Sequence, residues 1–183
     1  TSRGLGDVYK RQDPHVWLDP ENAKIEMEAI RDALCAADPE NSTVFQSNYE
    51  KYAAELDALD AEFREKLAPL PNRTIVVAHE AFGYLCDAYG LTQVGIEGLS
   101  PDSEPDPGRM AEVIDFVREH SISTIFFEEL VSPKVAEAIA SETGAQAKML
   151  SPLEGLSDEQ AAAGADYFSV MHDNLAALME ALN

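Results

Sequence analysis

From residue 74 onward, the chain alternates short apolar runs with longer helical patterns. Apolar runs of strand length occur at 74–78, 91–95, 123–127 and 145–150. Apolar residues recur at helical spacing over 80–89, 107–120, 133–142 and 158–181. Strands that alternate with helices form parallel sheets with helices on both faces. We therefore predict an α/β fold with a parallel sheet of about four strands and flanking helices.

The first part of the chain predicts two helices and no strand. One begins at Asp19-Pro20, a pair suited to the N-cap and the first helical position, and stops at Asp38-Pro39. The second begins at Ser42, the expected N-cap, and continues to residue 67 with apolar residues three and four positions apart. At 1.5 Å per residue this helix would be roughly 40 Å long, enough to cross a whole domain.

The chain is strongly acidic, and this restricts its partners. It has 34 acidic and 13 basic residues, so its formal net charge is -21. This charge repels the phosphates of nucleic acids and anionic membrane surfaces but attracts cations. We therefore expect no nucleic-acid partner. The sequence contains no run of about 18 apolar residues, so we also expect no membrane-spanning helix.

The two cysteines, Cys35 and Cys86, are not arranged as a metal site. Neither lies in a CxxC motif or at a Cys/His spacing typical of thiolate ligands. Each falls within an apolar helical pattern, which predicts two buried free thiols.

Polar residues follow every predicted strand. In open parallel sheets, ligands bind outside the carboxyl ends of the strands, so these positions are the candidates for a site. They are His79-Glu80, Glu97, Glu128-Glu129 and Glu154. All of them carry imidazole or carboxylate groups, which are donors for a cation.

A further histidine, His15, lies in the stiff segment DPHVWLDP at 13–20, where two prolines restrict the backbone. Together with His79 and Glu154 it supplies the nitrogen and oxygen donors that zinc accepts. Composition alone leaves a second interpretation open. A histidine after a strand is more often a hydrogen-bonded structural residue or a neutral helix-capping group than a metal ligand.

Several segments resemble one protein family in order and spacing. VAHEAFGYLCDAYGL and PLEGL look like the second and third metal-binding segments of the zinc-type substrate-binding proteins of ABC importers, a family that includes lipoproteins and adhesins. DPHVWLDP resembles the histidine segment of their first lobe. The resemblance continues through residues 100–146 and DYFSVMHDNLAAL, and covers nearly everything from 13 to 181.

This resemblance implies that His15, His79 and Glu154 ligate the metal. It implies a monomeric binding protein outside the cytoplasm, periplasmic or lipid-anchored, that delivers a divalent metal to a cognate ABC permease and performs no chemistry on it. Manganese-carrying relatives usually have glutamate at the position of His79 and aspartate at that of Glu154. Imidazole suits zinc better than manganese, so we expect Zn2+ as the ligand and regard Mn2+ as the lesser alternative.

The resemblance also divides the chain. It implies a first-lobe metal-ligand loop and long linking helix at 13–68, and a carboxyl-terminal metal-binding lobe at 69–183. Residues 1–12 show no clear period, unlike the patterned residues that follow, so we expect them to be a foreign or disordered tail. The family takes another histidine ligand from an amino-terminal lobe, for which this chain has no candidate. We therefore expect a fragment without that lobe, with its export signal upstream and with reduced metal affinity.

A zinc-dependent hydrolase is the alternative function. HEAF begins like the HExxH motif of zinc proteases, but the second histidine would fall at Gly83, so the motif fails. A zinc site that is open to water can nevertheless activate it, with Glu80 as the general base.

Other polar residues keep two interpretations each. Glu128 or Glu129 could orient an imidazole N–H, or one of them could cap the helix expected near Pro133. Glu97 and Glu104 lie in an acidic loop, where they could gather cations or remain solvated. The remaining histidines, His120 and His172, are expected on exposed helix surfaces.

Overall fold

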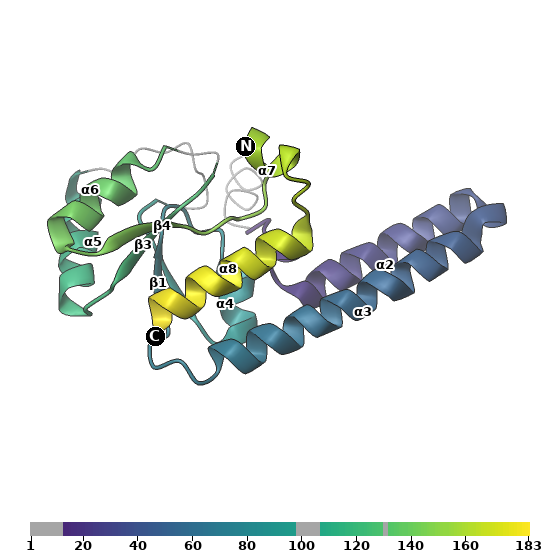
Figure 1. Ribbon diagram of the computed structural model, residues 1–183, viewed down its shortest axis with the longest axis horizontal. Coiled ribbons are helices and arrows are strands. Elements are labelled where there is room, and N and C mark those ends of the chain that lie inside the picture. The colour runs from purple at the N-terminus through teal and green to yellow at the C-terminus, as the bar shows by residue number, and fades with distance from the viewer. Residues whose placement is uncertain (1–12, 98–106, 130–131) are drawn as a thin grey trace, which may run out of the picture.

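The computed structural model describes residues 13–97, 107–129 and 132–183 (Figure 1). At its centre is a four-stranded sheet, all parallel, in the order β2-β1-β3-β4. The strands are β1 (Thr74–Val77), β2 (Thr92–Gly95), β3 (Thr124–Phe127) and β4 (Gln146–Met149). The predicted α/β class with a parallel sheet of four strands is therefore confirmed.

Helices cover both faces of the sheet. Neighbouring residues of a strand point to opposite faces, so each strand contributes side chains to two separate cores. Val76 belongs to the core that packs against α5 (Pro107–Glu119) and α6 (Lys134–Thr143). Ile75 and Val77 belong to the other core, which includes side chains from the three helices on that face. Those helices are α3 (Ser42–Leu67), α4 (Gly83–Tyr89) and α8 (Tyr167–Leu182).

The first part of the chain forms a helical hairpin that projects from the body of the molecule (Figure 1). The short helix η1 (Val16–Leu18) leads into α2 (Pro20–Ala37), and η2 (Pro39–Asn41) joins α2 to α3. The carboxyl-terminal half of α3 is anchored in the core by Leu59, Phe63 and Leu67. Apolar residues on the projecting part stay exposed, and they include Ile25, Ile30, Leu34 and Val44.

The predicted helix boundaries were wrong in three places. The helix expected over 158–181 is divided into α7 (Asp158–Ala162) and α8, with Gly164 at a positive φ of 75° between them. Such a backbone conformation breaks a helix and favours glycine. The helix expected to start at 80 begins at Gly83, because the residues after β1 form a loop. Ser42 lies inside α3, whose N-cap is Asn41 without a side-chain hydrogen bond.

The expectation for the cysteines was right for one of them. Both are free thiols, but Cys86 is buried and Cys35 is half-buried. Burial raises the pKa of the Cys86 thiol to about 12.

The expected tail at 1–12 and Glu104 lie outside the described residues. Among the described helices, none has both the length and the hydropathy needed to cross a membrane.

Candidate metal centre

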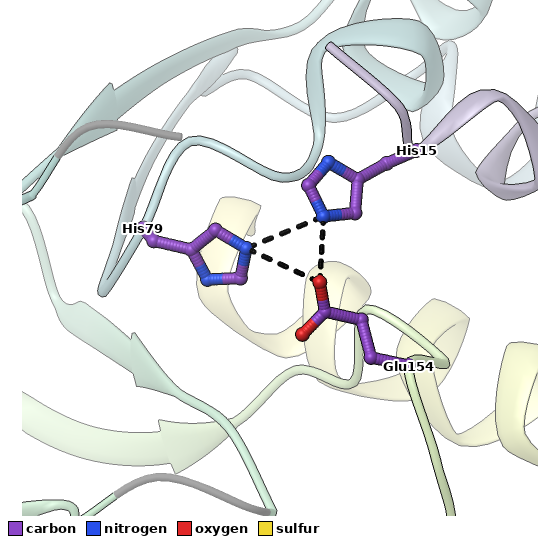
Figure 2. A group of neighbouring side chains, drawn as sticks. All are labelled: His15, His79 and Glu154. Carbon is purple, nitrogen blue, oxygen red and sulfur yellow. Dashed lines mark hydrogen bonds and ion pairs between the residues drawn. The ribbon is translucent and has the colours of Figure 1, made fainter. Parts of the chain in front are cut away.

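Three side chains from distant parts of the chain meet at the carboxyl edge of the sheet (Figure 2). His15 precedes η1, His79 lies two residues beyond β1, and Glu154 lies in the loop after β4. His15 Nε2 is 2.9 Å from Glu154 Oε1 and 3.4 Å from His79 Nε2, and His79 Nε2 is 4.0 Å from Glu154 Oε1. The sheet topology thus brings together the three residues singled out in the sequence.

Asp13 fixes the orientation of the His15 ring. Its Oδ1 accepts a hydrogen bond from the His15 backbone N–H at 2.9 Å and lies 2.7 Å from Nδ1 of the same residue. A proton on Nδ1 leaves the lone pair of Nε2 free toward the centre. The ring is 1% exposed and packs edge-on against Trp17. Sequence reasoning missed Asp13, although it stands only two residues before His15.

Glu128 has the corresponding position beside His79. Its Oε1 contacts His79 Nδ1, and both side chains are buried. Burial alone would lower the pKa of His79, but the hydrogen bond and charge of Glu128, with the charges of Glu154 and Glu97, outweigh it and raise the pKa above 6.5. The Glu128 carboxylate therefore holds Nδ1 of His79, and Nε2 of the same ring points toward His15 and Glu154.

Glu154 forms the solvent side of the cluster, with its side chain 35% exposed. The loop that carries it is tied to the segment of His15 by Trp17, whose Nε1 donates to the Pro152 carbonyl at 2.9 Å. Tyr167 on α8 donates in turn to the Trp17 carbonyl at 2.8 Å. Trp17 therefore joins two ligand segments and offers no lone pair to a cation itself.

The donor separations are compatible with one zinc ion. A tetrahedral zinc with bonds of about 2.0–2.1 Å separates its ligand atoms by roughly 3.3–3.4 Å. The three distances, from 2.9 to 4.0 Å, lie on either side of this value, so small side-chain movements would suffice. Two imidazole nitrogens and one carboxylate oxygen fill three of four tetrahedral positions, and the fourth remains for water or another donor.

The other acidic candidates lie around the cluster. Glu129 accepts from the hydroxyl of Ser151 and not from an imidazole. Neither it nor Glu128 caps α6, which starts after Pro133 without a side-chain cap. The side chain of Glu80 lies against Gly95, at the end of β2. Among the described residues, only His15, His79 and Glu154 form such a cluster of donors.

Sequence comparison shows which known proteins this chain resembles. The family model described as "Zinc-uptake complex component A periplasmic" matches residues 2–181. The high-affinity zinc uptake system protein ZnuA of Bacillus subtilis (strain 168) is 41% identical over 170 residues, which are 93% of this chain and 53% of that protein. The zinc-binding lipoprotein AdcA of Streptococcus pneumoniae serotype 4 is 43% identical over 168 residues, 92% of this chain and 34% of that protein.

Solved structures of similar proteins superpose on this chain over most of its length. The laminin-binding protein Lbp of Streptococcus pyogenes superposes with a TM-score of 0.85 at 38% identity, covering 93% of this chain and 66% of that one. The Zn(II)-bound ZnuA-like domain of Streptococcus pneumoniae AdcA superposes with a TM-score of 0.81 at 42% identity, covering 93% and 64%. This chain therefore spans about a third to two thirds of the proteins that it resembles.

Proposed function

The chain belongs to the family of periplasmic zinc-uptake components, and from this premise we propose that it captures zinc outside the cytoplasmic membrane and passes it to a cognate ABC permease. The observation that carries this proposal is the convergence of His15, His79 and Glu154, whose donor atoms all lie within 4.8 Å of one another. We propose these three residues as the zinc ligands.

The donor types favour zinc over manganese. Two neutral imidazoles and one carboxylate make a set that zinc accepts readily, whereas manganese prefers carboxylate, carbonyl and water oxygens. Both imidazoles already have a carboxylate on the opposite nitrogen, as metal-bound histidines generally do. The names of the relatives agree, since they are described as zinc-binding or zinc-uptake proteins.

A zinc-dependent hydrolase is not favoured. The relatives are named for binding and uptake, and none of those named above is described as an enzyme. The general base of that alternative, Glu80, lies against Gly95 and does not belong to the donor cluster. Capture and release of the ion therefore accounts for the site without a catalytic step.

The family supports the proposed location outside the cytoplasm. The family description is periplasmic and one relative is called a lipoprotein, so we place the protein on the outer side of the cytoplasmic membrane, either free in a periplasm or lipid-anchored. A monomer suffices for this task because all three proposed ligands come from one chain.

The test is a zinc titration of His79→Ala in competition with a chelator of known affinity. Loss of stoichiometric zinc binding is expected, because one of the three proposed donors disappears. His172→Ala is the matched control, since His172 is half-exposed on α8 and outside the donor cluster. Unchanged zinc affinity in His79→Ala would contradict the ligand assignment.

A further inference from the structure

Three polar side chains hold the loop that carries Glu154. They are Glu129 after β3, Ser151 after β4 and Asn174 on α8, and together they are called the Ser151 clamp. We propose that the Ser151 clamp positions the carboxylate of Glu154 for the metal. This inference rests on the proposed function, because it assigns residues that act through one of the proposed ligands.

Asn174 holds the backbone of Ser151 on both sides. Its Oδ1 accepts from the Ser151 N–H, and its Nδ2 donates to the Ser151 carbonyl, both at 2.8 Å. Both residues are buried. One amide group thus satisfies the donor and the acceptor of one peptide residue, which fixes where the loop leaves β4.

The hydroxyl of Ser151 then fixes the next turn of the loop. It donates to Glu129 Oε1 and accepts from the Leu153 N–H at 3.1 Å. Leu153 has a φ of 55°, in the left-handed region that residues with a side chain rarely adopt. Such a conformation persists only where surrounding contacts impose it. Because Leu153 directly precedes Glu154, the same contacts set the direction of the ligand.

Within the described part of the chain, the Glu129 side chain makes its hydrogen bond through Oε1, which accepts from Ser151. Its Oε2 is buried and lacks a hydrogen-bond partner there, which is an unfavourable arrangement for a carboxyl group. Its neighbour Glu128 contacts the ligand His79. Two consecutive residues at the end of β3 therefore reach two different ligands, one directly and one through Ser151.

The decisive experiment compares Ser151→Ala in two backgrounds, the natural chain and Glu154→Ala. Zinc affinity is measured by competition with chelators weak enough to report the residual binding of Glu154→Ala, in which His15 and His79 remain, and the folded state by circular dichroism of the metal-free proteins. We expect Ser151→Ala to weaken zinc binding by about tenfold or more in the natural chain. We expect no further loss in the Glu154→Ala background, because the clamp acts through that carboxylate.

Two further variants separate positioning from general stability. Glu129→Gln keeps an oxygen that can accept from Ser151 and is expected to bind zinc nearly as the natural chain does, whereas Glu129→Ala should lose about tenfold or more. Ser169→Ala removes a hydroxyl that accepts from the backbone N–H of Asp166 and donates to its carbonyl, at the exposed start of α8, and should leave zinc affinity unchanged.

Several results would overturn the inference. An equal loss from Ser151→Ala in both backgrounds, or no loss in the natural chain, would remove the link to Glu154. If Ser151→Ala does not fold, the same comparison with Glu129→Ala decides in its place. Natural affinity in Glu154→Ala would instead refute the ligand assignment itself, and the inference with it. A loss in Glu154→Ala without one in Ser151→Ala would refute only the clamp.

Discussion

Replacing Asp13 by alanine is expected to weaken zinc binding by roughly ten- to a hundredfold. Asp13 touches the centre only through His15, whose Nε2 faces the other two donors. Without the carboxylate, the buried imidazole loses the partner that holds the proton on Nδ1. The ring can then turn or change its tautomer, and either event removes a zinc donor.

The size of the effect follows from the contacts that are lost. One oxygen of Asp13 serves two groups of His15, the backbone N–H at 2.9 Å and Nδ1 at 2.7 Å. A hydrogen bond to a charged group contributes about 1.5–3 kcal/mol. Because each factor of ten in affinity corresponds to about 1.4 kcal/mol, the expected loss is about 1.4–2.8 kcal/mol.

Chelator competition measures the affinity, and two matched variants test the reasoning. Asp13→Asn keeps an acceptor oxygen and should lose less than Asp13→Ala. Gly83→Ala tests the contact between Asp13 and His15 from a second residue, at the start of α4. A Cβ at position 83 would lie 2.6 Å from Asp13 Oδ2 and push the carboxylate away. Natural zinc affinity in Asp13→Ala would show that His15 needs no such support, and would refute the reasoning.

Three other predictions concern pH and the fold. Zinc affinity is expected to fall with decreasing pH from a value above 6.5, because the raised pKa of His79 lets protons compete earlier, and Glu128→Gln should move this fall to lower pH. Gly95→Ala should destabilise the fold by about 1–3 kcal/mol, since its Cβ would lie 2.4 Å from the Glu97 carbonyl oxygen. Phe63→Ala should cost about 3–5 kcal/mol in the free energy of unfolding, because the ring is fully buried.

Each of these predictions has its own check. Zinc titrations at several pH values test the pH prediction. It would be contradicted if zinc affinity fell over the same pH range in Glu128→Gln as in the natural chain. Denaturant unfolding of the metal-free protein measures the other two. Val44→Ala, at an exposed site on the same helix as Phe63, is the control and should change stability little. A Gly95→Ala variant as stable as the natural chain would mean that the loop after β2 adapts freely.

Most of the fold could be predicted because its elements have strong local patterns. The apolar run at 74–78 and the helix at 42–67 were located within one residue, since burial imposes their periodicity. The break at Gly164 was missed although the sequence carries two signals for it, the glycine after α7 and the N-cap residue Asp166 at the start of α8. The sequence also could not predict that Ile25 and Ile30 are exposed to solvent, because it shows which helix face is apolar but not what covers that face.

The edge that carries the site could be predicted, but the detailed roles could not. Parallel strands bring their carboxyl ends to one edge, so the acidic residues there were all candidates. Which group each one contacts depends on side-chain direction: Glu128 and Glu129 are adjacent, yet the first contacts His79 and the second Ser151. Contacts between residues so far apart in the chain leave no local pattern. Only the partner of His15 had a local signal, because Asp13 lies within the same rigid turn.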